Sequence, residues 1–292
     1  MTSVEDVLGR DAWRELNETM LPEIRTIRRH GPGRLRRAAL KALVQLGGEK
    51  ALDPDDLAVL RRLIAIKRPG DRPHSLGGCW DHWLAVRGGD REGILRVLGL
   101  DRTAPSTYAM GQVLIDHLGH GGAEEGRYYR HVFVSPEING WTLVYGPSCD
   151  PDLPRVREWV SELSARYGDA QAYYYGSRGD GDSWLIGVRG EIVRWCSSLE
   201  PETATGEPLP VEHQVMAELE LTGRPEHLDD EDGEQTDFFF ECNAPRVARE
   251  LSVDAVWVDF PKDPVVSGRA VIAWPSADDD VSVFKGCYGV DV

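Results

Sequence analysis

The fold is decided by residues 132–145, VFVSPEINGWTLVY. Two runs of apolar residues flank Asn139-Gly140, the dipeptide that best fits the tight turn of a β-hairpin. The stretch therefore predicts two antiparallel strands, at 132–134 and 141–145. We expect the sheet of the protein to be built around this hairpin.

Further strands and helices are predicted on both sides of the hairpin. Before it, a strand leads into a helix that Asp90 caps and Gly99 ends. After it, an amphipathic helix begins at Asp152 and ends at Gly168, and more strands follow. We therefore expect an α+β domain with a mainly antiparallel sheet and helices on one face. The other predicted strands are 80–86, 170–175, 183–188, 191–196, 238–242, 255–260 and 269–274, and a last helix is predicted at 245–251.

The first 70 residues differ in pattern from the rest of the chain. They predict three amphipathic helices, the last of which opens at Asp53-Pro54, where Asp53 is a natural N-cap. A change of composition then marks a domain boundary. Residues 1–70 are predicted to form HEAT-like helical hairpins, and residues 71–292 to form the α+β domain. We expect the helical part to be a separate layer that can be removed without unfolding the rest.

Charge is distributed unevenly along the chain. Seven basic residues and no acidic one occur between Ile24 and Gly48. This pattern predicts either a helix face docked on an acidic neighbouring domain or a patch for nucleic acid or another acidic partner. An acidic stretch interrupted by prolines, near 200–236, predicts an exposed loop. The basic residues are Arg25, Arg28, Arg29, Arg34, Arg36, Arg37 and Lys41.

The composition of the whole chain limits the class of protein. The formal net charge of −16 disfavours nucleic acid as the general partner, because phosphate is repelled. The first residues lack the basic and apolar segments of a secretory signal, and no apolar run approaches the roughly 20 residues that span a bilayer. Five widely spaced cysteines without a C-x-x-C pair predict reduced thiols rather than disulfides. We therefore expect a cytoplasmic protein without membrane contact.

The hairpin stretch also carries a resemblance to known sequences. Residues 133–144, FVSPEINGWTLV, resemble a segment of uncharacterised bacterial proteins, chiefly from actinobacteria. In those proteins a helix ending in a Leu-Ser…Tyr-Gly pattern follows, as at 163–168 here, and then a tryptophan-bearing hairpin, as at 184–194 here. Residues 51–67 are similar to their N-terminal part. The resemblance supports the predicted fold, and it carries no activity and no catalytic residue across.

Motifs for catalysis and for metal binding are weak. The pairs Cys79-x-x-His82 and His117-x-x-His120 offer four possible zinc ligands, but residues three apart in a strand face opposite sides. We therefore predict no bound metal. The absence of a P-loop and of a G-x-G-x-x-G motif predicts no nucleotide cofactor. Cys149 precedes a predicted helix, where a thiol pKa can be lowered, although isolated cysteines are usually inert.

Aromatic and arginine side chains stand out in the α+β domain. They lie on or beside adjacent predicted strands, so they form either the core or an exposed surface of the kind that dominates binding hot spots. Because Trp141 and Trp184 each begin a strand after a turn, we expect at least one of them to be mostly buried. The candidate binding residues are Trp141, Tyr173, Tyr175, Arg178, Trp184, Arg194 and Glu137.

Two classes of function follow from these residues. The absence of catalytic signatures favours a non-enzymatic binding protein, which uses the aromatic and arginine-bearing surface or a cleft for a protein partner or a small organic ligand. The alternative is a cofactor-free enzyme, such as a cyclase, isomerase or hydrolase, with an aromatic-lined pocket. In that enzyme Glu137, Asp81 or a histidine would be the acid or base.

Overall fold

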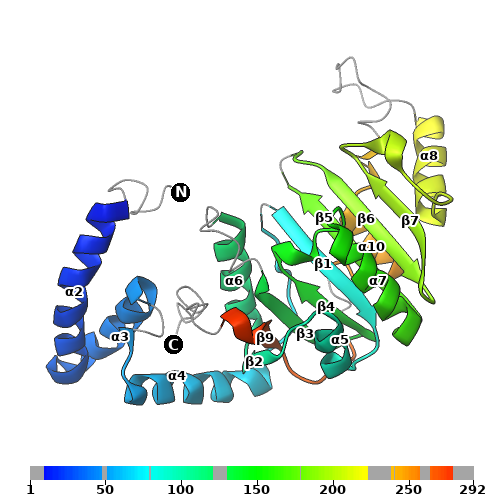
Figure 1. Ribbon diagram of the computed structural model, residues 1–292. Coiled ribbons are helices and arrows are strands. Elements are labelled where there is room, and N and C mark those ends of the chain that lie inside the picture. Colours follow the sequence, from blue (N-terminus) through cyan, green and yellow to red (C-terminus); the bar gives the residue numbers. More distant parts are fainter. Residues whose placement is uncertain are drawn as a thin grey trace.

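The computed structural model describes residues 10–47, 51–78, 80–120, 130–177, 179–222, 238–239, 241–256 and 264–278. These residues form an α+β fold around one antiparallel sheet of nine strands, as the sequence predicts (Figure 1). The strand order is β2-β9-β3-β4-β1-β5-β6-β7, and β8 pairs with β3. The strands are β1 (Trp80–Arg87), β2 (Arg102–Pro105), β3 (Val132–Ile138), β4 (Trp141–Tyr145), β5 (Asp169–Gly176), β6 (Asp182–Val188), β7 (Glu191–Ser197), β8 (Val266–Ser267) and β9 (Val271–Trp274).

The hairpin of β3 and β4 lies in the middle of the sheet and forms as predicted. Ile138 pairs with Trp141 across the turn, and Asn139 and Gly140 have φ angles of 52° and 85°. Both angles lie in the left-handed region, as a type I′ turn requires. Glycine adopts this region without a steric penalty, which is why Asn-Gly specifies the turn.

Helices cover both faces of the sheet, so the expectation of helices on one face is wrong. The alternate side chains of β1 enter two hydrophobic clusters: Trp83 and Ala85 belong to one, and Leu84 and Val86 to the other. Helices α6, α8 and α10 contribute to the first cluster, and α5 and α7 to the second. The physical reason is the continuous apolar run of β1, which is typical of a strand buried on both faces. The described helices are α2 (Arg10–His30), α3 (Gly33–Gly47), α4 (Pro54–Lys67), α5 (Arg91–Val97), α6 (Tyr108–His120), α7 (Pro154–Tyr167), α8 (Pro210–Thr222) and α10 (Ala244–Leu251).

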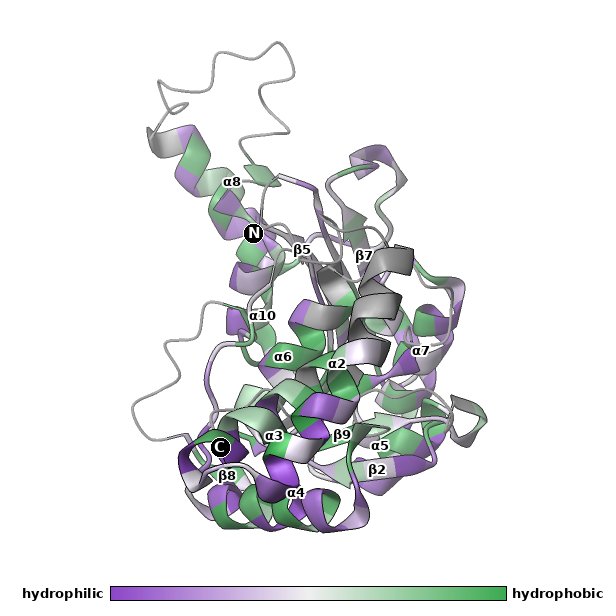
Figure 2. Ribbon diagram, turned by 90° about the vertical axis from the view of Figure 1, so that its left-hand side faces the viewer, coloured by the Kyte–Doolittle hydropathy of each residue, from purple (hydrophilic) through white to green (hydrophobic). Residues whose placement is uncertain are grey.

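The N-terminal helices share buried surface with the sheet. Helices α2 and α3 form a hairpin, and α4 runs from this pair toward β2 and β9 (Figure 1). Hydrophilic and hydrophobic residues alternate along α4 (Figure 2). Leu40 and Val44 of α3 and Leu60 of α4 belong to the same cluster of buried residues as Trp83 of β1. That residues 1–70 can be removed without unfolding the rest stays a prediction.

The first turn of α4 receives basic side chains from α2. Asp53 caps α4 as predicted, since its side chain accepts a hydrogen bond from the backbone nitrogen of Asp56. Nε of Arg28 lies 2.6 Å from Oδ1 of Asp56, and Nη2 of Arg29 lies 3.2 Å from Oδ2 of Asp53. These acidic neighbours belong to the helical part itself and not to the α+β domain, in contrast to the expectation.

The stretch 200–236 is not a continuous loop. It contains a short 3₁₀ helix, Pro201–Thr203, and the helix α8. Pro210 is the first residue of α8, a position where proline is favoured because the missing N–H has no intrahelical partner there. The rest of the acidic stretch, 223–236, lies outside the described residues.

Two strands predicted near the C-terminus are not found. Phe238, Phe239 and Glu241 are helical, so the predicted strand at 238–242 is wrong. Ala255 and Val256 belong to no strand, and 257–260 lie outside the described residues. The strand predicted at 269–274 is present as β9. Among the described helices, none combines the length and the apolar character that crossing a membrane requires.

Candidate functional site

Three of the predicted binding residues lie in the core. Trp141 is 6% exposed, and Tyr173 and Trp184 are fully buried, so the prediction that at least one of the two tryptophans is buried is confirmed. The ring of Tyr173 stacks on that of Trp83, with the ring centroids 5.0 Å apart. These three aromatic side chains pack the sheet against its helices, and they do not form an exposed surface.

Arg194 and Trp184 belong to a buried polar network at the start of α8. The carboxylate of Glu212 accepts hydrogen bonds from Nε1 of Trp184 at 2.7 Å and from Nε of Arg194 at 3.1 Å. Its second oxygen lies 3.0 Å from Nη2 of Arg194 and accepts from the backbone nitrogen of Leu209 at 2.9 Å. Because the two charges are paired and hydrogen-bonded, the network can hold α8 on β6 and β7 without an unpaired buried charge.

The remaining predicted residues lie elsewhere. Tyr175 is half-buried and packs against the cluster that contains Trp184. Glu137 is half-buried and lines a separate pocket beside Gly89. Arg178 lies outside the described residues. The structure therefore does not gather the predicted residues into one site.

The start of β1 carries two of the acid–base candidates. Asp81 is 3% exposed, and its Oδ1 accepts a hydrogen bond of 2.7 Å from the backbone nitrogen of Gly78. Its Oδ2 has no hydrogen-bond partner among the described residues. Burial raises the pKa of Asp81 to about 7, and the carboxylate of Asp116 adds to this effect. His82 stacks on Tyr174 with ring centroids 4.6 Å apart, and burial lowers its pKa.

Of the four possible zinc ligands, the structure describes the side chain of His82 alone. Cys79 and the side chains of His117 and His120 lie outside the described part of the chain. Among the side chains that the structure does describe, no group of three or more His, Cys, Asp and Glu residues is placed to hold a metal ion. The absence of a metal site thus stays a prediction.

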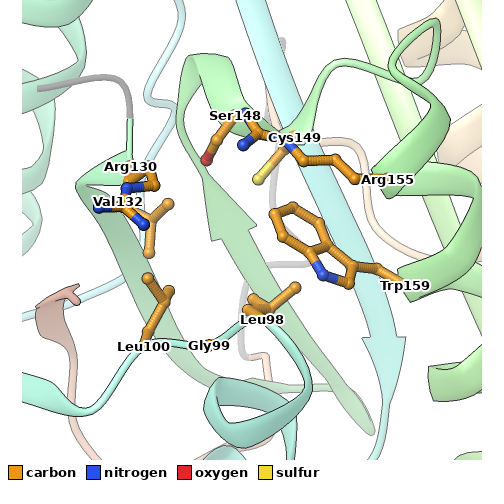
Figure 3. A pocket seen from close by; sticks show the side chains of 9 residues that line it. All are labelled: Leu98, Gly99, Leu100, Arg130, Val132, Ser148, Cys149, Arg155 and Trp159. Carbon is orange, nitrogen blue, oxygen red and sulfur yellow. The ribbon is translucent and has the colours of Figure 1, made fainter. Parts of the chain in front are cut away.

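An arginine- and tryptophan-lined pocket lies between α5 and α7 (Figure 3). Its volume is about 150 Å³. Figure 3 shows Ser148 and Cys149 on one side of the space, Leu98 and Leu100 on the other, and Trp159 beside them. We call it the α5–α7 pocket, and its lining residues are Leu98, Gly99, Leu100, Arg130, Val132, Ser148, Cys149, Arg155 and Trp159.

Local chain geometry brings these side chains together. Gly99 has a φ of 68°, which ends α5 and allows Leu98 and Leu100, on either side of it, to line the pocket. Arg155 and Trp159 are four residues apart in α7, so they lie on the same face of that helix. A 3₁₀ turn, Pro147–Cys149, follows β4 and places the side chains of Ser148 and Cys149 at the opposite wall.

The charge of the α5–α7 pocket is positive. The guanidinium carbon of Arg155 lies 5.4 Å from the centroid of the Trp159 ring, an arrangement that fits a cation–π contact. Arg130 contributes a second guanidinium group. None of the described residues that line the pocket is acidic. An anion with an apolar body therefore matches this pocket in charge and in character.

Cys149 does not have the properties of a nucleophile. Its side chain is 1% exposed, and burial raises the pKa of the thiol to about 12. A thiol pKa can be lowered near a helix N-terminus, but here the loss of hydration outweighs the effect of Arg155, in line with the expectation that an isolated cysteine is inert. The thiol stays protonated at neutral pH and acts as an apolar part of the wall.

Sequence reasoning singled out Cys149 alone among the lining residues. Trp159 and Arg155 lie within the helix predicted between Asp152 and Gly168, and no motif marks Arg130, Arg155 or Trp159. The spacing of Arg155 and Trp159 is the one local signal, because a cation and an aromatic ring four residues apart share a helix face.

Comparisons with protein-family models, with curated proteins and with solved structures found no match. The resemblance to actinobacterial proteins therefore stays a prediction.

Proposed function

We propose that the protein is a non-enzymatic binding protein that holds a small organic acid in the α5–α7 pocket. The observation that carries this proposal is the pairing of two arginines, Arg130 and Arg155, with an apolar wall and no acidic lining residue in the described structure. The proposal keeps the class of function that the sequence favours, an aromatic and arginine-bearing cleft for a small ligand. It moves the site away from the residues that the sequence singled out.

The size of the pocket supports a ligand about as large as a benzene ring. Apolar protein cavities of about 150 Å³ bind benzene, and the α5–α7 pocket has a volume of about 150 Å³. The ring or branched chain of the ligand would contact Leu98, Leu100 and Trp159. Its carboxylate would receive charge-assisted hydrogen bonds from the guanidinium groups. Benzoate combines these two features and serves as the probe.

The chemistry of the lining supports binding rather than catalysis. The Cys149 thiol has a pKa raised to about 12 by burial, so a thiolate is not available for attack. Asp81, the buried carboxyl whose pKa is raised to about 7, does not line this pocket. The pocket thus offers positive charge and apolar surface, without a general base among its described residues.

Calorimetric titration with benzoate tests the proposal. We expect benzoate to bind and the uncharged analogue benzamide to bind at least about tenfold more weakly, because it lacks the charge that the arginines recognise. Arg155→Met should weaken benzoate binding by about tenfold or more. Arg157→Met is the matched control, since Arg157 lies on the same helix, is exposed and does not line the pocket. The proposal fails if benzoate does not bind, or if both variants bind it as the parent does.

A further inference from the structure

A second pocket lies where the helical part meets the sheet. It has a volume of about 490 Å³ and is lined by Arg68, just after α4, by Arg91 at the start of α5, and by Arg269, just before β9. We call it the junction pocket. It shares no lining residue with the α5–α7 pocket.

The three arginines are held in place by backbone carbonyl groups. Nη1 of Arg91 donates to the carbonyl of Arg269 at 2.8 Å, and Nη1 of Arg269 donates to the carbonyl of Arg68 at 2.7 Å. Nη2 of Arg68 donates to the carbonyl of Ala270 at 3.2 Å. These bonds connect the end of the helical part to the sheet, and they bring three positive charges to one pocket.

No carboxylate of the described structure forms an ion pair with these three arginines. Each guanidinium group has five N–H donors, and each uses one in a backbone hydrogen bond. Nε of Arg68 is buried without a hydrogen-bond partner among the described residues. Burial and the neighbouring charges of Arg269 and Arg91 lower the pKa of Arg68. The carboxylate of Asp71 opposes this shift, and it accepts a hydrogen bond from the backbone nitrogen of Tyr108 at 3.0 Å. The three guanidinium groups still have more N–H donors than the backbone carbonyl groups accept from.

Asp90, Glu92 and Glu137 also line the junction pocket, and none of them forms an ion pair with its three arginines within the described structure. The carboxylate of Asp90 accepts hydrogen bonds from the backbone nitrogen of Gly93 at 3.0 Å and from the hydroxyl of Tyr167 at 2.7 Å. Glu92 is exposed at the start of α5. The carboxylate of Glu137 lies against Gly89, and no hydrogen bond or ion pair of this group is found within the described residues. Glu137 is thus an acceptor that faces the same pocket.

We propose that the junction pocket binds a small phosphorylated metabolite with free hydroxyl groups, such as a sugar phosphate. A phosphoryl dianion offsets more of the charge of three guanidinium groups than a single carboxylate does, and its oxygens match their donors. The carboxylate of Glu137 is positioned to accept a hydrogen bond from a ligand hydroxyl group. The pocket volume of about 490 Å³ is in the usual range for small-molecule sites.

Titration of the full chain at constant ionic strength tests this site. The probes are glucose 6-phosphate, inorganic phosphate and glucose, with calorimetry as the measurement. We expect glucose 6-phosphate to bind more tightly than inorganic phosphate, and glucose not to bind. Arg91→Gln and Arg269→Gln should each weaken both phosphate ligands by about tenfold or more, since each removes charge-assisted hydrogen bonds. Glu137→Gln should reduce the preference for the sugar phosphate over inorganic phosphate.

Matched variants separate this site from general charge effects and from the α5–α7 pocket. Arg96→Gln removes an exposed charge from the same helix as Arg91, and it should leave phosphate binding unchanged. Arg155→Met should weaken the binding of benzoate and not that of the phosphate ligands. The two pockets are therefore tested independently, and a negative result for one does not contradict the proposal for the other. The proposal is overturned if no phosphate ligand binds the parent, or if Arg96→Gln weakens binding as much as Arg91→Gln and Arg269→Gln do. Equal binding of both phosphates by the parent and by Glu137→Gln would overturn the assignment of a hydroxyl-bearing ligand.

Discussion

The indole Nε1 of Trp184 donates a hydrogen bond of 2.7 Å to the carboxylate of Glu212, and neither residue is more than 1% exposed. This bond joins β6, next to the edge strand β7, to the first turn of α8. The same carboxylate pairs with Arg194. Trp184 and Arg194 look like binding residues in the sequence, but they are therefore parts of the scaffold. The consequences for stability can be measured.

Glu212→Ala is expected to lower the free energy of unfolding by about 3–5 kcal/mol, because it leaves Arg194 as a buried charge without its partner. Glu218→Ala is the control on the same helix. Glu218 is exposed and pairs with Arg246 at 2.8 Å, so its loss should change stability by less than about 1 kcal/mol. Urea unfolding measures both variants. Equal unfolding midpoints for the two would contradict a structural role of the network.

Trp141→Ala is expected to lower the free energy of unfolding by about 3–5 kcal/mol, since the side chain is 6% exposed and its removal leaves a cavity. Trp80→Ala provides the comparison, because Trp80 begins β1 and is 39% exposed. Its loss should have a much smaller effect. Thermal melts decide whether Trp141 is a core side chain or an exposed one. If Trp141→Ala melts at the same temperature as the parent, Trp141 lies on the surface.

The stability of the protein should fall as the pH rises toward 7 and above, in part because of Asp81. The pKa of Asp81 is about 7 in the folded protein against an ordinary value of 3.8, so the folded state binds this proton more tightly. The stabilisation is complete below the ordinary pKa and is lost as the pH rises through the folded pKa. A difference of this size corresponds to at most about 4 kcal/mol.

Asp81→Asn removes this titration and keeps an oxygen that can accept from Gly78. We therefore expect the variant to lose less stability than the parent between about pH 5 and about pH 8. Urea unfolding at both pH values measures the difference. If parent and variant show the same pH dependence, the carboxyl of Asp81 is not held protonated by burial.

Alkylation by iodoacetamide should be slow at Cys149 in the folded protein. Cys149, Cys196 and Cys242 are buried, and burial raises the pKa of each thiol to about 12. At about pH 8 only on the order of one thiolate in ten thousand thiols is then present. Peptide mass spectrometry locates the modified residues, with the urea-unfolded chain as the control. Rapid modification of Cys149 in the folded chain would restore it as a candidate nucleophile.

The elements that the sequence predicts well are those with local signals. The Asn139-Gly140 turn and the Asp53 and Asp90 caps act within a few residues, so they can be recognised without the fold. Long-range contacts do not leave such signals. That β1 is buried on both faces depends on which helices return to it from later in the chain.

Helix α6 is the clearest element that the sequence analysis missed. Gly111 lowers its helix propensity, yet a Cβ at this position would lie 2.5 Å from Cδ2 of Phe133. The glycine therefore allows β3 to pack closely against the helix, and tertiary packing outweighs local propensity. One local signal was present: Thr107 precedes the helix, and its Oγ1 accepts a hydrogen bond of 3.3 Å from the backbone nitrogen of Met110.

The α5–α7 pocket was beyond prediction for a different reason. Its lining residues come from four separate parts of the chain, at 98–100, 130–132, 148–149 and 155–159. None of these parts has a recognisable motif. The chemistry of Cys149 also depends on burial, which outweighs the local effect of a nearby helix N-terminus.

Benzoate titration of protein labelled with ¹⁵N at the tryptophan indole nitrogens tests the central claim most directly. Trp159 lines the α5–α7 pocket and Trp80 does not, so the two indole signals report on different places. Trp159→Phe and Trp80→Phe assign the signals. We expect the Trp159 signal to shift in a saturable manner with benzoate, and the Trp80 signal to stay unchanged. A Trp159 signal that does not respond, or a response confined to other tryptophans, would contradict binding of a small organic acid in this pocket.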